Sequence, residues 1–337
     1  MAIIDKPSDY FNTVLYTGNG GTQSITGVGF QPDFTWIKGR SYVDDHALFD
    51  TIRGVTKILY SNEVNAEETY ANSLTAFDSD GFSIGSMAEV NTNSATLVSW
   101  NWKAGTSSGI NTTNSTITPA GYSFNQTAGF SIIKYPGNGT NDAKCPHGLG
   151  VAPKMIFIKD LGNAANWECY NASIGNGKVI YLNLTTAAEA TSARWRNTSP
   201  DAVNWTMGST TAVNGSGRNY VAYCFADVKG YSKISSYVGN GNVNGSFIYT
   251  GMKPAWLMIK KSSASGSGWM IFDTKRNPTN DGATLRLPAN GTESEATDHI
   301  LDILSNGFKI RDSDATLNTS GGTFIYMAFA ENPFVTS

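Results

Sequence analysis

The sequence predicts an all-β protein made of three tandem β-sandwich modules, either jelly-roll-like or concanavalin-like. Two observations lead to this prediction: the composition, and a series of landmarks that occurs three times. The 337 residues include 35 glycines and 12% aromatic residues, and only 15% of them are charged. Short apolar runs bounded by Gly, Asn or Pro are frequent, while long runs with helical spacing are few, which is typical of β structure.

The repeated landmarks are a Gly-Asn-Gly turn, a proline, and an apolar strand that ends in lysine six residues after the proline. A period of roughly 100 to 120 residues is too long for a solenoid repeat of about 20 to 50 residues, and each copy is large enough to bury its own core. The chain is therefore predicted to be an internal triplication. The landmarks are Gly18-Asn19-Gly20, Pro32 and Lys38, then Gly137-Asn138-Gly139, Pro153 and Lys159, then Gly239-Asn240-Gly241, Pro254 and Lys260.

The repeat predicts β modules at residues 1–103, 130–229 and 230–337. Residues 104–129, rich in Gly, Ser, Thr and Asn, are predicted to be a linker or surface arm. Because almost nothing separates the second and third copies, we expect these two to pack closely and module 1 to lie on a longer tether.

Each module is expected to begin with an edge strand that enters the Gly-Asn-Gly turn, followed by the strand after the proline. Each copy closes on an aromatic, apolar run, at residues 97–102, 220–226 and 324–330, which we expect to be a central strand. In the last two runs both alternating sets of side chains are apolar, so a second sheet should cover the outer face. A surface turn, consisting of one helical turn, is predicted to recur in the three copies, at residues 66–68, 187–189 and 294–296.

Composition excludes several classes of protein. The net charge of −3 without a basic cluster argues against nucleic-acid binding. No run of 18 apolar residues is present to insert into a membrane, and the N-terminal residues lack the features of a signal peptide. We therefore expect synthesis in a cytoplasm without a cleaved leader. The unrepeated Cys145, Cys169 and Cys224 are expected to be buried free thiols.

The search for catalytic, cofactor and metal motifs predicts a non-enzymatic protein without a cofactor or metal. Asp78-Ser79-Asp80-Gly81 lacks the downstream glutamate of a calcium loop and is predicted to be a β-turn. Cys145-Pro146-His147 lacks the second ligand pair of a zinc site. Asp50/Arg53 and Asp273/Arg276 recur at one spacing, which indicates a structural ion pair or turn.

Glycan chemistry remains the alternative. Glycoside hydrolysis needs two carboxylates across a cleft, and the sequence does not pair the available ones, which include Glu63, Glu67, Glu68 and Glu168. Exposed aromatic rings can instead stack on sugars. Trp195, in a charged stretch, is the best surface candidate, and Trp167 and Trp205 are further candidates for glycan contact. Trp36 and Trp256 are predicted to belong to the core.

Three segments resemble a family of repeat proteins encoded by tailed bacteriophages, especially marine ones. They are Asp9-Tyr10-Phe11-Asn12-Thr13 through Gly21, Val28-Gly29-Phe30-Gln31-Pro32-Asp33-Phe34, and Tyr326-Met327-Ala328-Phe329-Ala330-Glu331-Asn332-Pro333-Phe334. The resemblance covers nearly the whole chain and provides no catalytic residues. It implies a structural protein on the virion exterior, made in the host cytoplasm, as a capsid decoration or a fibre or appendage subunit.

The partners that follow from this resemblance are other capsid or tail subunits, together with further copies of the chain. A homo-oligomer is expected, with a trimer as the candidate form. The three modules in one chain would also match a three-fold or pseudo-three-fold position of a particle. The first alternative is a tail-fibre or receptor-binding adhesin that recognises host surface glycan. The second is a glycan-degrading enzyme.

Overall fold

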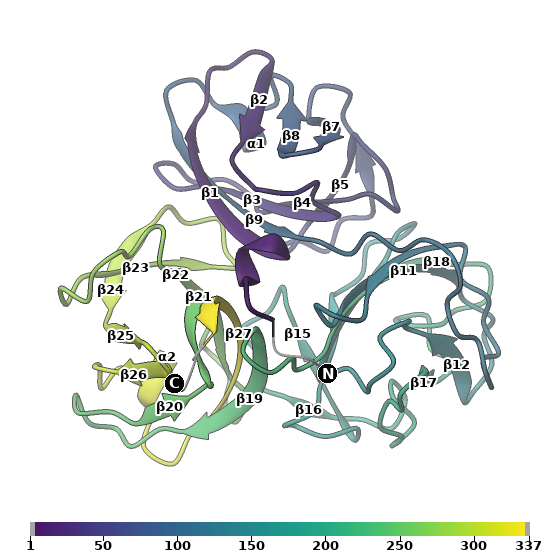
Figure 1. Ribbon diagram of the computed structural model, residues 1–337. Helices are drawn as coiled ribbons and strands as arrows, with labels where there is room; N and C mark the ends of the chain where they lie inside the picture. The colour runs from purple at the N-terminus through teal and green to yellow at the C-terminus, as the bar shows by residue number, and fades with distance from the viewer. Residues whose placement is uncertain (1–3, 334–337) are drawn as a thin grey trace.

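The computed structural model describes residues 4–333, which form three lobes around a common centre (Figure 1). We call the lobes modules 1, 2 and 3 in chain order. A short 3-10 helix, η1 (Pro7–Asp9), precedes the first strand. No helix within residues 4–333 has the length and apolar character needed to cross a membrane.

Module 1 combines a six-stranded sheet with a three-stranded sheet. Its elements are β1 (Phe11–Thr17), β2 (Gln23–Thr26), β3 (Phe34–Gly39), β4 (Ala47–Asp50), β5 (Lys57–Tyr60), β6 (Glu68–Thr69), β7 (Leu74–Asp78), β8 (Gly81–Ile84), α1 (Ala88–Asn91) and β9 (Thr96–Trp102). The large sheet has the order β1-β9-β3-β4-β5-β6 and the small sheet β2-β8-β7.

Module 2 repeats this plan with one more strand in its large sheet and one fewer in its small sheet. Its elements are β10 (Gly121–Asn125), β11 (Phe130–Pro136), β12 (Ala143–Pro146), β13 (Met155–Asp160), β14 (Glu168–Asn171), β15 (Lys178–Tyr181), β16 (Glu189–Ala190), β17 (Asn204–Met207) and β18 (Asn219–Phe225). The large sheet has the order β10-β11-β18-β13-β14-β15-β16, and β12 pairs with β17.

Module 3 has the same two sheets as module 1. Its elements are β19 (Ser232–Val238), β20 (Phe247–Tyr249), β21 (Met252–Lys261), β22 (Trp269–Asp273), β23 (Thr284–Pro288), β24 (Ala296–His299), β25 (Leu301–Leu304), β26 (Gly307–Ile310), α2 (Ala315–Asn318) and β27 (Thr323–Pro333). The orders are β19-β27-β21-β22-β23-β24 and β20-β26-β25.

The predicted all-β class with sandwich modules is confirmed. The closing strands β9, β18 and β27 each lie between two other strands of their large sheet, as expected of central strands. Their register defines equivalent positions in the three modules: Trp102, Phe225 and Phe329 lie opposite Phe34, Met155 and Trp256.

Four hydrophobic cores hold the molecule together. Three of them are private and lie between the large and small sheets of one module. The fourth is common to all three modules and contains aromatic side chains from each, among them Trp100, Tyr223 and Phe329. Since the common core buries one face of every large sheet, each large sheet is covered on both sides, which explains the two apolar faces of its closing strand.

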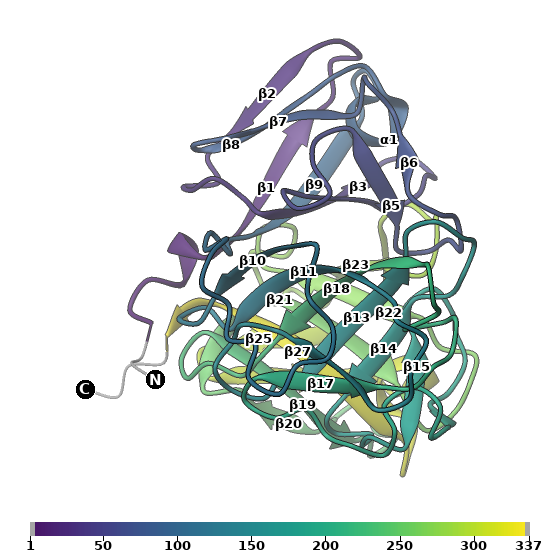
Figure 2. The same cartoon turned by 90° about the vertical axis from the view of Figure 1, so that its right-hand side faces the viewer.

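Two sequence-based expectations about the modules are wrong. Residues 104–129 are built into module 2 instead of forming a linker: β10 pairs with β11, and Ile117, Phe124 and Ala128 are buried. Module 1 is not on a tether, because it packs into the common core with both other modules (Figure 2). The apolar residues scattered among the polar ones in 104–129 supply the burial that a free arm lacks.

The segments 66–68, 187–189 and 294–296, predicted as surface turns, instead lie where one module meets the next. The backbone N–H of Glu67 donates to the Leu161 carbonyl of module 2, and that of Ala188 donates to the Ser262 carbonyl of module 3. The N–H of Glu295 donates to the Arg40 carbonyl of module 1, which closes the cycle. Short strands begin at or next to these residues, because pairing with β5, β15 and β23 satisfies their backbone.

Candidate functional site

The Gly-Asn-Gly turns are each held by a second asparagine from the same module. In module 1 the N–H of Asn19 donates to Asn91 Oδ1 at 2.8 Å, and Asn91 Nδ2 donates back to Asn19 Oδ1 at 3.0 Å. Asn214 and Asn318 make the same exchange with Asn138 and Asn240. We call Asn91, Asn214 and Asn318 the inner asparagines, and all three are fully buried.

Both glycines of the first turn are required by its geometry. A Cβ at Gly18 would lie 2.2 Å from the Thr92 carbonyl oxygen, and Gly20 has a φ of +69°. The residues of this motif are therefore required for the conformation of the turn and for its hydrogen bonds to the second asparagine. The most conspicuous repeat in the sequence thus stabilises the fold of each module.

The repeated lysines join each module to its neighbour. Lys159 Nζ donates to the Val64 carbonyl of module 1 at 2.7 Å, and Lys260 Nζ to the Thr185 carbonyl of module 2 at 3.1 Å. Lys38 Nζ donates to the Thr292 carbonyl of module 3 at 3.2 Å, so the three contacts form a closed ring. Each lysine is fully buried and donates to a second carbonyl in its own module. Burial lowers the pKa of all three to about 8.

Aromatic side chains form a second set of contacts between the modules, and each module contacts the same neighbour as it does through its lysine. Trp167 Nε1 donates to the Tyr60 carbonyl of module 1 at 2.8 Å, and Trp269 Nε1 donates to the Tyr181 carbonyl of module 2 at 2.8 Å. His46 occupies the third such position and accepts a hydrogen bond from Trp36 Nε1 on Nδ1. Burial lowers the pKa of His46 well below its ordinary value, and this effect exceeds the opposing one of the Pro288 carbonyl of module 3. The His46 imidazole at the junction of modules 1 and 3 is therefore buried and neutral, and its Nδ1 is held by Trp36.

The repeated Asp/Arg pairs are confirmed as structural ion pairs. Arg53 Nε binds Asp50, Arg276 Nε binds Asp273, and all four side chains are fully buried. Each carboxylate also accepts a hydrogen bond from the closing strand of another module: Asp50 from the Tyr223 hydroxyl at 2.6 Å, and Asp273 from Trp100 Nε1 at 3.0 Å. These carboxylates are therefore fully occupied and unsuited to acid–base catalysis.

The three predicted glycan contacts are buried, so the prediction is wrong for these residues. Trp195 is 1% exposed, and Trp167 and Trp205 are 0% exposed. The charged neighbours of Trp195 misled the sequence argument. Arg194 turns to Glu168 at 2.8 Å, while the Trp195 ring packs at 5.7 Å against Tyr170 and donates to the Lys178 carbonyl.

The carboxylates considered for hydrolysis serve local contacts. Glu168 pairs with Arg194, and Glu67 lies 3.5 Å from Arg53. Glu68 accepts hydrogen bonds from Asn65 Nδ2 and the Tyr70 hydroxyl, and Glu63 accepts from Asn62 Nδ2 at 3.4 Å. Asp80 lies in the turn between β7 and β8, as predicted, and accepts from the N–H groups of Gly27 and Gly29.

The cysteine and histidine candidates are also occupied or inert. Cys145, Cys169 and Cys224 are free and buried, as predicted, and burial raises the pKa of each thiol. His147 accepts on Nδ1 from the Leu149 N–H, and its Nε2 faces the Asp201 carbonyl at 3.1 Å. No group of three or more metal-ligating side chains is found among the described residues.

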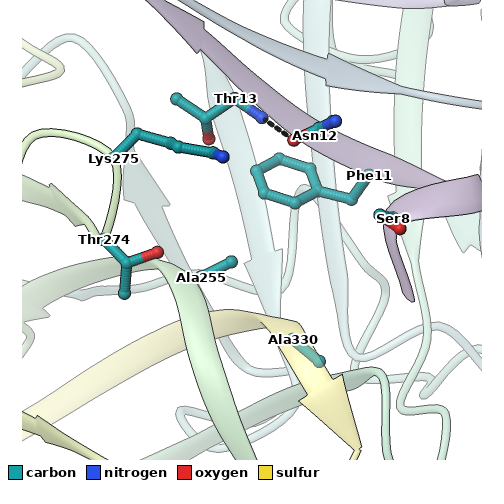
Figure 3. A pocket seen from close by; sticks show the side chains of 8 residues that line it. All are labelled: Ser8, Phe11, Asn12, Thr13, Ala255, Thr274, Lys275 and Ala330. Atoms are coloured by element: carbon teal, nitrogen blue, oxygen red, sulfur yellow. Dashed lines mark hydrogen bonds between the residues drawn. The ribbon is translucent and has the colours of Figure 1, made fainter. Parts of the chain in front are cut away.

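Two surface features remain as candidates, and the sequence argument missed both. The first is the outer edge of β20, where Phe247 is 46% exposed and Tyr249 is 60% exposed. The second is a pocket of about 150 Å³ between modules 1 and 3, lined by Ser8, Phe11, Asn12, Thr13, Ala255, Thr274, Lys275 and Ala330 (Figure 3). A comparison of equivalent positions in the three copies is the sequence signal that identifies both.

Comparison with known proteins gives a family without an activity. Neither the curated proteins nor the solved structures contain a match to this chain. A family model described as a domain of unknown function (DUF7483) matches residues 6–333.

Proposed function

The chain belongs to the DUF7483 family, and we propose that it is a non-enzymatic structural subunit of a larger particle, which a neighbouring subunit joins at the outer edge of β20. The edge is unusual in a protein whose other repeated features are internal. Of the nine large hydrophobic side chains that are exposed among the described residues, four lie between positions 238 and 249. They are Val238, Val243, Phe247 and Tyr249.

The equivalent edge in module 2 carries a strand-like segment of its own chain. The N–H groups of Thr116 and Ile117 donate to the Lys144 carbonyl at 2.9 and 3.0 Å, and the Lys144 N–H donates to Thr116 Oγ1 at 2.8 Å. Ile117 is buried in this contact. This covered edge is the observation that carries the proposal, because it shows how the fold accepts an added segment here.

Phe247 occupies the position of Lys144. Cys145 pairs with Trp205 in module 2, and Ile248 pairs with Phe308 in module 3, which places Lys144 and Phe247 one residue earlier on equivalent strands. Backbone groups of alternate residues point to opposite edges of a strand, so those of Phe247 and Tyr249 face away from β26. An exposed apolar edge strand is a template for pairing with another chain.

The side chains at this edge distinguish module 3 from module 1. At the positions of Phe247 and Tyr249, β2 of module 1 has Ser24 and Thr26. Two small polar residues in one copy are thus replaced by two exposed aromatic residues in the other. We propose that an extended segment with apolar side chains, from a neighbouring subunit, pairs with β20 as residues 116–117 pair with β12.

The resemblance to repeat proteins of tailed bacteriophages supports the virion exterior as the location, as a capsid decoration or an appendage subunit. A rigid block with three-fold pseudosymmetry and no disulfides is suited to assembly by symmetry, with further copies as partners. The adhesin alternative loses its residue support, because its tryptophans are buried. The enzyme alternative loses its carboxylates to local ion pairs and hydrogen bonds.

The test exchanges the β20 edge for that of module 1. Phe247→Ser with Tyr249→Thr should abolish incorporation of the protein into particles, as measured by its amount in purified virions. Folding should be unchanged to within about 0.5 kcal/mol, because both side chains are exposed. Val55→Ser, at another exposed position, is the matched control and should incorporate normally.

A double variant that enters particles as the wild type does would overturn the role of β20. Cryo-electron microscopy of the intact particle tests the broader proposal. Density on the particle exterior with a segment along β20 is the expected result, and a protein absent from the particle would contradict the structural role.

A further inference from the structure

The pocket between modules 1 and 3 lies at a place where the junction between modules 1 and 2 holds the side chain of Asp33. It is bounded on one side by β1 of module 1, and on the other by the start of β21 and the residues after β22 of module 3 (Figure 3). The Thr274 N–H donates to the Ala255 carbonyl here, as the Thr51 N–H donates to the Asp33 carbonyl in module 1. This shared bond establishes which residues of the two junctions correspond.

The junction between modules 1 and 2 has a carboxylate where the pocket has none. Asp33 occupies the position of Ala255, and it is nearly buried. Its carboxylate accepts hydrogen bonds from Thr51 Oγ1 at 3.1 Å, Ser123 Oγ at 3.1 Å and the Ala104 N–H at 2.9 Å. The fold thus places an oxyanion at this point of a junction and surrounds it with donors.

The pocket has one hydroxyl that corresponds to a donor of the junction between modules 1 and 2, and further polar groups that this junction lacks. Thr274 corresponds to Thr51, but the carboxylate that Thr51 binds is replaced by the methyl group of Ala255. Lys275 and Thr13 stand where the junction between modules 1 and 2 has Ile52 and Ile132, as the alignment of β1 with β11 shows. Two apolar residues of one junction are therefore replaced by an ammonium and a hydroxyl in the other.

One of these polar groups lacks a hydrogen-bond partner within the described residues. Thr13 is 4% exposed, and its Oγ1 has no hydrogen-bond partner among the described residues. A buried hydroxyl without a partner is destabilising, and a bound acceptor would satisfy it. Figure 3 shows the Thr13 oxygen and the Lys275 ammonium directed toward the same hollow, and no acidic residue lines it.

We propose that this pocket binds a carboxylate-bearing small molecule, whose carboxylate takes the place that Asp33 occupies in the neighbouring junction. Lys275 provides the charge, Thr13 and Thr274 provide hydroxyl donors, and the Phe11 ring provides an apolar wall. The volume of about 150 Å³ is below the roughly 300 Å³ at which drug-sized sites begin, so the ligand is a small acid or a single acidic group at the end of a larger chain. This inference does not depend on the proposed structural role.

The test compares acetate with acetamide, which has the same shape and no charge. Two-dimensional amide NMR of the full chain should show saturable shifts at Thr13 and Thr274 with acetate, and shifts at least tenfold weaker with acetamide. Glucuronate, compared with glucose, tests whether an acidic sugar is accepted. Binding of glucuronate but not glucose would assign the site to an acidic glycan end, and binding of acetate alone would assign it to free small acids.

Three variants make the result specific. Lys275→Met removes the charge at an exposed position and should lower acetate affinity at least tenfold, while the control Lys178→Met should leave it unchanged. Thr13→Ile with Lys275→Ile rebuilds the filled junction and should abolish binding while raising the melting temperature. Equal shifts with acetate and acetamide, no saturable shifts with acetate, or full binding by Lys275→Met would each overturn the proposal.

Discussion

The junctions that module 1 makes with its two neighbours differ from the junction between modules 2 and 3. All three contain a buried lysine that donates to a carbonyl of the next module. Only the two junctions of module 1 also contain a buried Asp/Arg pair. At the third junction Asn171 and Ile174 stand in place of the aspartate and arginine.

The Asp/Arg pair is present where the closing strand of the adjacent module provides a hydrogen-bond donor to the aspartate. Tyr223 donates to Asp50, and Trp100 donates to Asp273, whereas the equivalent residue facing module 2 is Met327, which has no donor. A buried carboxylate without that donor would be less well satisfied, and the third junction has none. The lysine depends on backbone carbonyls, which every module provides, so it is common to all three.

The largest effect should come from breaking an ion pair that only the junctions of module 1 possess. Arg53→Ile leaves Asp50 buried without its cation and should lower the unfolding free energy by about 3–5 kcal/mol. Chemical denaturation of the purified protein measures this loss.

The matched control converts the junction to that of modules 2 and 3. Asp50→Asn with Arg53→Ile installs the residues found in module 2 and should recover most of the loss, because the amide still accepts from Tyr223 and no charge is buried. If the double variant were as unstable as Arg53→Ile alone, the explanation from unpaired charge would fail.

An intermediate effect is expected at the lysine that all junctions share. Lys159→Met leaves the Val64 and Ala165 carbonyls without this donor and should cost about 1–3 kcal/mol. The equivalent changes at Lys38 and Lys260 should cost similar amounts. A loss at only one of the three would show that the ring of lysines is not equivalent in energy.

The same lysines predict a pH dependence. Their pKa is about 8 in the folded protein and about 10.4 in an unfolded chain, so between these values the unfolded chain binds more protons. The unfolding free energy should therefore rise as the pH increases from 8 toward 10. Denaturation at pH 7.5, 8.5 and 9.5 should show this rise, and Lys159→Met should remove about a third of it.

The smallest effect of the series is expected at the ring of aromatic donors. Trp269→Phe removes the hydrogen bond to the Tyr181 carbonyl and should cost about 1–2 kcal/mol. Trp269→His, which installs the residue of module 1, tests whether the imidazole of His46 is an adequate substitute. If the Trp269→His variant were less stable than Trp269→Phe, a histidine at this position would be shown to require the hydrogen bond that Trp36 donates to His46.

Much of the fold could be predicted from the sequence, because the repeat and the strand patterns are local. The all-β class, the central closing strands and the Asp/Arg pairs follow from residues within one copy. The inner asparagines were also within reach: Asn91, Asn214 and Asn318 each lie five residues before the first residue of a closing strand. That constant spacing is the signal that went unused.

The ring of junctions could not be predicted in this way. Lys38 contacts a carbonyl 254 residues away, and a backbone acceptor leaves no mark in the sequence. Trp195 shows the opposite failure, since charged neighbours indicated exposure while the ring is buried. Burial is decided by which segments meet in space, and a single sequence records this only indirectly.

The closed ring of junctions also determines when the protein can finish folding. Lys38 is made early, but the Thr292 carbonyl that it binds is made 254 residues later. At about 5–20 residues per second, ribosomes need roughly 10–50 seconds for that interval. During this time the aromatic face that module 1 contributes to the common core lacks the side chains of module 3. This apolar surface is therefore open to aggregation until module 3 has been made.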